Sequence, residues 1–358
     1  MDRIEKITIE NYKSIDHCSI DNCNEINLLV GPPNSGKSNI IENLSVSTEL
    51  FYHTPLLIKS KFSTENKINS LKEQFRFSSP FDLFYNSKLD YPICANCKIE
   101  FSNEKLLISR IELSDKEIKK NILKPANSII SKHHYINKIN ELWIDFFHTD
   151  FEEIGSNINC YKFKSFDKNS TFNNKQLLPI YGENLGEVIY FNEELQKYIQ
   201  SELQKVGMSL SIIKNDKTPK AQLTDKNGVS LLFDFYMLAD TFQRIVFYKA
   251  AILSNKESIL LFEEPEAHCY EPYMIDFVKD ILYCGNDNQY FIVTHSDFIL
   301  QEFLRDEENR QRTNIYMVKN ESNQGTKVKL INKENKDVYN YGMNVFFNFE
   351  SLWEETKN

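Results

Sequence analysis

One eight-residue segment narrows the possible folds of this chain more than any other. Residues 31–38 read Gly-Pro-Pro-Asn-Ser-Gly-Lys-Ser and match the pattern G-x-x-x-x-G-K-[ST] of a phosphate-binding loop, or P-loop. The apolar run Ile26–Val30 before the loop predicts a buried strand, and apolar residues at helical spacing in 39–44 predict a helix after it. The sequence therefore predicts the strand–loop–helix unit in which a P-loop works.

The residue types in this loop suit a nucleoside triphosphate. Glycines at positions 31 and 36 let the backbone turn and bring its N–H groups close to phosphate oxygens. The helix that begins near Lys37 points its positive end at the anion. We expect Lys37 to reach the β- and γ-phosphates and the Ser38 hydroxyl to ligate Mg²⁺. The predicted cofactors are ATP and Mg²⁺, and the predicted binding residues are Gly31, Pro32, Asn34, Ser35, Gly36, Lys37, Ser38 and Asn39.

Composition limits the classes of protein to which the chain can belong. It has 358 residues, 41% of them apolar, which is enough for one large domain or two. The net charge of -9 argues against a broadly basic nucleic-acid surface, although a local basic patch stays open as an alternative. The sequence shows no apolar run of membrane-span length, no signal peptide and no regular cysteine spacing, so we expect a cytoplasmic protein that makes no membrane contact.

Two further apolar runs end in polar groups. Ser258–Glu266 reads as a buried parallel strand that ends in two acids and a proline, and Gln289–Ser296 reads as another that ends in Thr-His-Ser. Sites in α/β proteins form at the carboxyl ends of strands, which favours a functional role for these groups. The alternatives are a solvated acidic turn and a structural histidine.

Ile9–Ile15 and the P-loop that follows it resemble the start of ABC-type ATPase heads, in particular those of structural-maintenance-of-chromosomes (SMC), RecF-like and overcoming-lysogenization-defect (OLD)-like ATPases. The resemblance implies an α/β P-loop fold with a mixed core sheet and N-terminal antiparallel strands. It also implies that Glu264 orients or deprotonates the attacking water and that His295 contacts the γ-phosphate. Glu263 stands where this superfamily usually has Asp. The catalytic residues implied are Lys37, Glu264 and His295, and the metal ligands implied are Ser38 and Glu263.

Residues 238–244 fall where these ATPases carry a signature segment, which caps the nucleotide of the partner in a head-to-tail dimer. Three positions match the family pattern: Leu238, Gln243 and Arg244. Ala239 and Thr241 replace the family's serine and glycine. Asp240 could cap the following helix, but its carboxylate would repel a γ-phosphate. The resemblance therefore implies a weakened or altered contact in trans through Asp240 and Gln243, and the alternative is an ordinary helix start.

We divide the chain into a discontinuous ATPase core (1–50 and 207–335), an inserted strand and helix subdomain (51–206) and an aromatic C-terminal tail (336–358). Ile4–Ile9 is expected to be an edge strand, and the insertion is expected to be mainly helical. Further strands are predicted at 93–101, 105–113, 208–213, 221–223 and 229–235, and helices at 115–140, 140–147 and 183–206. Gln74 is a candidate for the glutamine that follows the P-loop in this superfamily.

The function implied by the resemblance is Mg²⁺-dependent ATP hydrolysis in a homodimer or higher oligomer. OLD-like relatives carry a C-terminal topoisomerase-primase domain that this chain does not show, so the effector is expected to be a separate protein. By analogy it would be a nuclease or toxin in bacterial anti-phage defence. One alternative is a RecF-like DNA-repair ATPase that binds DNA as an ATP-closed dimer. Another is a non-hydrolysing, ATP-bound scaffold.

Overall fold

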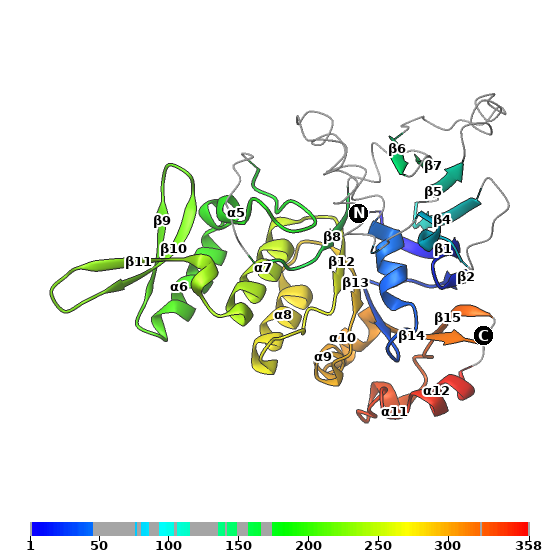
Figure 1. Ribbon diagram of the computed structural model, residues 1–358. Helices are drawn as coiled ribbons and strands as arrows, with labels where there is room; N and C mark the ends of the chain where they lie inside the picture. Colours follow the sequence, from blue (N-terminus) through cyan, green and yellow to red (C-terminus); the bar gives the residue numbers. More distant parts are fainter. Residues whose placement is uncertain are drawn as a thin grey trace.

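The computed structural model describes residues 2–45, 76, 80–85, 93–103, 106–114, 135–139, 142–148, 157–165, 174–322 and 324–356. The described strands form three sheets, and the helices lie mainly on one side of the central sheet (Figure 1). Gln74 and the predicted helix residues 115–134 lie outside the described residues.

The central sheet places the P-loop beside the two other polar strand ends. Its strand order is β15-β14-β3-β13-β12-β8. The members are β3 (Ile26–Val30), β8 (Ile158–Tyr161), β12 (Ile259–Glu263), β13 (Gln289–Val293), β14 (Thr313–Glu321) and β15 (Gly325–Leu330). All are parallel to their neighbours except β15, which is antiparallel to β14. The expected P-loop fold with a mixed core sheet is therefore confirmed.

Both faces of this sheet are buried, as in other parallel sheets. Alternate residues of β3 show the division, because Leu28 joins a core on the helix side and Leu29 joins a core on the opposite side. The second core also contains Ile40 and Ile41 from the helical residues 37–45 that follow the P-loop. The helix side carries α5 (Leu185–Phe191), α6 (Glu193–Gln204), α7 (Asp240–Ser254), α8 (Glu271–Tyr283) and α9 (Asp297–Phe303). The P-loop helix is thus held between two sheets.

A second, antiparallel sheet covers the face that carries the P-loop helix. Its order is β2-β1-β4-β5-β7-β6. The strands are β1 (Ile4–Tyr12), β2 (Ile15–Ile20), β4 (Ile93–Phe101), β5 (Leu106–Ser114), β6 (Tyr135–Ile139) and β7 (Leu142–His148). β1 lies between β2 and β4, so the expectation of an edge strand is wrong. The cause is that β4, which we assigned to an insertion, completes the N-terminal sheet.

The prediction of a helix at 140–147 is also wrong. Residues 142–148 form the strand β7, which pairs with β5 and β6. Residues 135–139, at the end of the other expected helix, form β6. Short apolar runs fit a strand as well as a helix, and the aromatic residues of this run favour a strand. The described part of 51–206 contains the five strands β4–β8 and the two helices α5 and α6, so it is not mainly helical.

The helix expected at 183–206 is divided at Asn192. The Asn192 side chain accepts a hydrogen bond from the Leu195 N–H at 2.9 Å and so caps α6 after α5 has ended. β8 pairs with β12 in the central sheet, although its residues fall inside the expected insertion. The core therefore extends into the segment 51–206.

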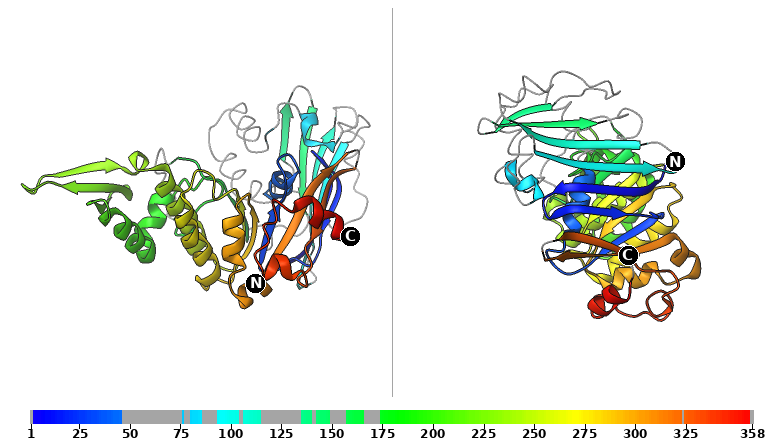
Figure 2. Two further views of the ribbon diagram at one scale, coloured as in Figure 1. Left: turned by 90° about the horizontal axis from the view of Figure 1, so that it is seen from below. Right: turned by 90° about the vertical axis from the view of Figure 1, so that its right-hand side faces the viewer.

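A three-stranded sheet of β9 (Ser209–Ile213), β10 (Thr218–Thr224) and β11 (Ser230–Asp234) extends away from the body (Figure 2). The three strands expected here are confirmed. The short helix η4 (Phe235–Met237) follows β11 and leads directly into the segment that precedes α7. The extended sheet and the signature-like segment are thus neighbours in the chain.

The C-terminal residues return to the central sheet through α10 (Glu307–Arg312) and the β14–β15 hairpin, then continue as α11 (Lys336–Tyr339) and α12 (Phe349–Glu355). Val338, Leu352 and Trp353 are buried, whereas Tyr341 and Phe347 are exposed. The tail therefore packs on the core and leaves two aromatic rings uncovered. No described helix is both long enough and apolar enough to span a bilayer.

Candidate functional site

The carboxyl ends of β3, β12 and β13 lie next to one another in the central sheet, which brings the P-loop, the two acids and His295 together. A cavity of about 640 Å³ opens at this edge. It is lined by Ser14, Pro33, Asn34, Ser35, Gly36, Lys37, Ser38, Asn39, Arg76, Glu264 and His295. We call it the phosphate cavity. Two predicted loop residues, Gly31 and Pro32, line a neighbouring cavity instead.

The loop backbone takes conformations that need its residue types. Gly36 has φ +102°, and a Cβ there would overlap the Thr326 side chain. Thr326 also bonds to Ser14, both through its hydroxyl to Ser14 Oγ (2.8 Å) and through its N–H to the Ser14 carbonyl (2.9 Å). The P-loop is therefore braced by residues from both ends of the chain.

Lys37 is held by the loop itself. Its ammonium group donates to the carbonyls of Gly31 and Pro32, at 2.8 Å each, and to Ser35 Oγ at 3.2 Å. Burial lowers the pKa of Lys37 to about 8. A phosphate that entered the cavity would place negative charge beside this buried cation, in addition to that of the nearby Glu264 carboxylate.

Glu264 has a conformation that is rare for glutamate. Its φ is +46°, and its N–H donates to the Val293 carbonyl at 2.9 Å, which fixes the turn after β12 against β13. Its Oε1 lies 3.4 Å from His295 Nε2. Burial and the nearby Lys37 lower the pKa of His295, although Glu264 acts in the opposite direction. The imidazole that shares the cavity with Glu264 is thus neutral at neutral pH.

Glu266 positions the histidine, a role that we did not predict. Its Oε1 accepts hydrogen bonds from Thr294 Oγ1 at 2.9 Å and from the His295 N–H at 2.6 Å. Burial raises the pKa of Glu266 despite these hydrogen bonds. The side chain therefore joins the segment after β12 to the segment after β13. The signal in the sequence was the third acid of Glu-Glu-Pro-Glu, which we left without a role.

Glu263, the last residue of β12, lies between a hydroxyl and two cations. Its carboxylate is hydrogen-bonded by Ser38, and it lies 3.3 Å from Lys162 Nζ and 3.6 Å from Arg76 Nη1. Burial alone would raise the pKa of Glu263, but Lys162, Arg76 and Ser38 together lower it. The carboxylate is thus ionised beside the hydroxyl predicted to share a metal with it.

This oxygen pair fits Mg²⁺, which prefers hard oxygen donors and uses few protein ligands besides phosphate and water. Among the described residues, no three or more His, Cys, Asp or Glu side chains form a separate metal cluster. The residues that would hold Mg²⁺ are therefore Ser38 and Glu263, with the remaining ligands left to phosphate and water.

Arg76 and Lys162 are site residues that sequence reasoning missed. Arg76 also binds Glu42, a fully buried carboxylate of the P-loop helix, through Nη2 at 2.7 Å and Nε at 3.1 Å. Tyr12 and Lys13 bond to the other oxygen of Glu42. This network links the P-loop helix to β1 and Glu263. Lys162 follows β8, a strand that we did not predict, and no pattern around Arg76 pointed to it.

The signature-like segment lies outside the phosphate cavity of its own chain. Helix α7 begins at Asp240 and its N-cap, Ala239, makes no side-chain cap, so Asp240 does not cap the helix as we expected. Asp240 instead accepts a hydrogen bond from Arg244 Nε at 2.6 Å. Gln243 is buried and donates to the carbonyls of Tyr236 and Leu238 at 3.0 and 2.8 Å. Of the two residues predicted to contact the nucleotide of a partner chain, only Asp240 is exposed. Gln243 instead stabilises the loop that precedes α7.

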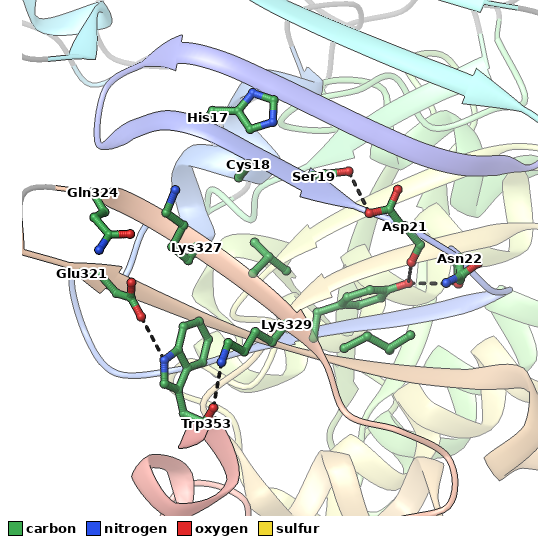
Figure 3. A pocket seen from close by; sticks show the side chains of 13 residues that line it. His17, Cys18, Ser19, Asp21, Asn22, Glu321, Gln324, Lys327, Lys329 and Trp353 are labelled. Carbon is green, nitrogen blue, oxygen red and sulfur yellow. Dashed lines mark hydrogen bonds between the residues drawn. The ribbon is translucent and has the colours of Figure 1, made fainter. Parts of the chain in front are cut away.

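Another cavity, of about 520 Å³, lies between β2, β15 and Trp353 (Figure 3). Trp353 Nε1 donates to Glu321 Oε1 at 3.1 Å, and Lys329 Nζ donates to the Trp353 carbonyl at 3.0 Å. Polar groups of this cavity thus bond to one another, and none of the predicted site residues lines it.

Comparison with known proteins agrees with this geometry. The family described as AAA domain matches residues 6–227, which is more than half of the chain. A solved SMC head bound to the C-winged helix domain of ScpA is 16% identical with a TM-score of 0.51, and covers 92% of this chain and 98% of that one. An SMC head from Pyrococcus furiosus, bound to the C-terminal domain of ScpA, is 13% identical with a TM-score of 0.50, and covers 93% and 97%. These two likenesses concern the fold.

A curated tRNA dimethylallyltransferase from Malacoplasma penetrans (strain HF-2) is 30% identical over 158 residues, covering 37% of this chain and 52% of that protein. The chain thus spans about half the length of this relative. The family match, the head fold and the P-loop at the end of β3 agree with one another. The chain therefore belongs to the AAA-domain family, and its fold is similar to that of SMC heads.

Proposed function

We propose that this chain binds ATP with Mg²⁺ in the phosphate cavity, hydrolyses it, and uses the ATP-bound state to pair two copies and gate a separate partner protein. The observation that carries the proposal is the meeting of Lys37, Glu264 and His295 in one cavity. A cation, a carboxylate and an imidazole on three neighbouring strand ends suit phosphoryl transfer to water, which depends mainly on positioning and charge stabilisation.

The loop and its lysine would bind the phosphates. Residues 34–39 line the cavity and include the start of the following helix, whose positive end favours an anion. Lys37 would exchange the carbonyls of Gly31 and Pro32 for β- and γ-phosphate oxygens. Arg76 also lines the cavity and would add a second positive charge. These groups are preorganised because the Glu42 network holds the helix and Arg76 together.

The reaction itself would use Glu264 and His295. Glu264 would orient the attacking water and accept its proton, and neutral His295 would donate a hydrogen bond to the γ-phosphate. Glu266 would hold His295 through its backbone N–H. Mg²⁺ bound by Ser38 and Glu263 would neutralise charge on the β- and γ-phosphates. The positive φ of Glu264 directs this side chain away from the course of β12 and into the cavity.

Phosphate release tests the enzymatic part of the proposal. We expect slow hydrolysis by the wild type and none by Glu264→Gln, which keeps its size but cannot accept a proton, while both bind ATP. Glu271→Gln, at the exposed start of α8, is the matched control and should hydrolyse ATP as the wild type does. Equal phosphate release by Glu264→Gln and wild type would show that another group is the base.

The same assay separates the enzyme from the non-hydrolysing scaffold. A specific observation favours keeping the scaffold as a second candidate, since Glu263 lies beside Lys162 and Arg76, two cations that compete with a metal ion for its oxygens. ATP binding without turnover in the wild type would support the scaffold and contradict the enzyme.

The gating of a separate nuclease or toxin in anti-phage defence is supported by the family resemblance. Affinity capture from the native host, with Glu264→Gln loaded with ATP, tests it by comparison with Lys37→Ala, which should not bind ATP. A partner retained only by the ATP-bound form is the expected result. A RecF-like function predicts instead DNA binding that needs ATP and weakens steeply with salt. The net charge of -9 is unfavourable for that alternative.

A further inference from the structure

The backbone on both sides of the His295 side chain is fixed by hydrogen bonds. Glu266 accepts the His295 N–H, as described above. The next residue, Ser296, caps α9 by accepting the Ile299 N–H at 3.3 Å. Bonds of this kind fix the main chain but leave the two side-chain torsions of the histidine open to several rotamers. The imidazole therefore needs contacts of its own if its Nε2 atom is to keep one position in the phosphate cavity.

The imidazole contacts side chains from two different parts of the chain. The 3.4 Å approach of Glu264 Oε1 to His295 Nε2 involves a single atom of the ring. On the C-terminal tail, the Phe346 ring stacks on the imidazole with a centroid distance of 6.5 Å and an angle of 30° between the ring planes. A contact at one atom leaves a ring free to tilt, whereas a stacked ring restricts its plane. Phe346 is thus the contact that restricts the plane of the imidazole.

A turn in the tail holds Phe346 in place. Asn344 Oδ1 accepts hydrogen bonds from the N–H groups of Phe346 and Phe347 at 3.0 Å each. Val345 is fully buried, and the Phe346 side chain packs against the core on the helix side of the central sheet. The Phe347 side chain, in contrast, is 91% exposed. The turn therefore directs one of two adjacent phenyl rings onto His295 and the other into solvent.

Helix α12 attaches this turn to the central sheet. Phe349 and Trp353, both buried, stack on one another with a centroid distance of 6.0 Å. Trp353 Nε1 donates to Glu321 at the end of β14, and Lys329 of β15 donates to the Trp353 carbonyl. The segment that carries Phe346 is therefore anchored on the β14–β15 hairpin, and its ring has a rigid support.

The imidazole lies between the phosphate cavity and the tail. A neighbouring cavity of about 440 Å³ is lined by Gly31, Pro32, Pro33, His295 and residues 346–351. His295 and Pro33 line the phosphate cavity as well, whereas Phe346 does not. Loss of the Phe346 ring would thus leave open space into which the imidazole could turn, without removing any group that lines the phosphate cavity.

We propose that Phe346 is a positioning residue of the ATPase, whose ring holds the His295 imidazole in the orientation that contacts the γ-phosphate. The C-terminal tail is then part of the site. This inference rests on the proposed function, in which His295 donates a hydrogen bond to the γ-phosphate. Donors stabilise a transition state best when they are oriented beforehand, and a small displacement of such a group lowers the rate considerably. Phe346 acts through His295 alone.

The first measurement needs no nucleotide. NMR spectra of protein with ¹³C-labelled histidine report the Cε1–H resonance of His295, which is assigned by its absence from His295→Gln. We expect Phe346→Leu, which keeps an apolar side chain but removes the ring, to shift this resonance, because a stacked ring changes the local magnetic field. Phe347→Leu is the matched control, the same substitution one residue later, and should leave the resonance in place. An unshifted resonance in Phe346→Leu would overturn the inference.

The second measurement compares ATP with ADP, since only ATP carries the γ-phosphate. Dissociation constants are measured by isothermal titration with Mg²⁺ in the Glu264→Gln background. We expect Phe346→Leu to weaken ATP binding about three- to tenfold, the range for an aromatic pair, and to leave ADP binding unchanged. Phe346→Tyr, which restores a stacked ring, should bind ATP as the parent does. Equal weakening of both nucleotides would mean that the substitution disturbs the P-loop as a whole, contrary to this inference.

A double variant separates positioning of His295 from a general effect on structure. In His295→Gln, the addition of Phe346→Leu should cause no further loss of ATP affinity, because no imidazole is left to hold. A loss that persists in His295→Gln would show that Phe346 acts by another route and would overturn the inference. Circular dichroism melts of each variant check that the fold is retained.

The outcomes also distinguish this inference from the proposed function. A parent that prefers ATP to ADP, together with a Phe346→Leu variant that keeps the same preference, would contradict the inference and leave the proposed function intact. A parent that binds neither nucleotide would contradict both.

Discussion

His295 Nε2 lies 3.4 Å from Glu264 Oε1, so the proposed contact to the γ-phosphate and the proposed base form a direct pair. The relationship makes the charge on His295 important. A neutral imidazole leaves Glu264 free to accept a proton, whereas an imidazolium would hold the carboxylate in an ion pair and make it a weaker base.

The first prediction concerns pH. Burial, followed by Lys37, lowers the pKa of His295 below its usual value near 6.5, so the ring is neutral at pH 7 and becomes charged as the pH falls through that lowered pKa. We expect kcat to be nearly constant from pH 7 to 8 and to fall in acid, at a pH below the ordinary imidazole value of about 6.5. His295→Gln should have a lower kcat but should lack this step. The measurement is phosphate release at saturating MgATP from pH 5 to 8.5, and an identical acid limb in both proteins would assign the step to another group.

The second prediction concerns the metal requirement. Lys162 lies 3.3 Å from Glu263, so its charge opposes a metal ion there. We expect Lys162→Gln to lower the Mg²⁺ concentration for half-maximal ATP binding by about three- to tenfold. The free-energy change that corresponds to this factor is a small part of the Coulomb energy between two charges at this distance. Binding of a fluorescent ATP analogue at varied Mg²⁺ measures the effect. The control is Lys164→Gln, a substitution of the exposed lysine two residues after Lys162. This variant should leave the Mg²⁺ requirement unchanged. A higher Mg²⁺ requirement in Lys162→Gln would mean that Lys162 helps to bind the nucleotide.

The third prediction concerns the loop backbone. A Cβ at Gly36 would overlap Thr326 in a conformation with φ +102°. Gly36→Ala should therefore weaken ATP binding at least about tenfold, because the loop must shift away from Thr326 and from phosphate. Gly285→Ala is the control, since Gly285 also has a positive φ, +69°, but has open space around it. Isothermal titration with ATP measures both, and equal affinities in the two variants would contradict the clash.

The fourth prediction concerns stability. Glu42 is fully buried and is bonded by Tyr12, Lys13 and Arg76. Glu42→Ala would leave the largely buried Lys13 ammonium without this carboxylate, and we expect a loss of about 3 kcal/mol in the free energy of unfolding. Urea denaturation measures the loss.

Glu10→Ala, on the exposed side of β1, is the control for this substitution and should change stability by about 0.5 kcal/mol or less. A similar small loss in Glu42→Ala would show that the network around Glu42 contributes little to folding.

The strand ends around the P-loop could be predicted because their signals are local. Ile26–Val30 and Ser258–Glu266 are short apolar runs with polar ends, and the parallel sheet brings such ends together whatever the connections between them. The loop, Glu264 and His295 therefore meet as the sequence suggested. Their roles in binding and hydrolysis stay predictions.

The parts that could not be predicted depend on contacts between distant segments. β4 joins β1 across the P-loop unit, and β8 joins β12 across about one hundred residues, and neither pairing has a local signature. Lys162 could not be placed at the site without β8. The strand β7 was mistaken for a helix because an apolar run of this length has no decisive period.

Through Thr326, the C-terminal third of the chain helps to shape the proposed nucleotide site. Its side chain lies against Gly36 and hydrogen-bonds to Ser14. The β14–β15 hairpin therefore packs against a loop that lies some 290 positions earlier in the chain. A fragment that stopped before β14 would retain every recognisable motif. It would lack Thr326, however, against which the turn at Gly36 packs. The smallest fragment that we expect to bind ATP therefore includes this hairpin and extends beyond the last motif.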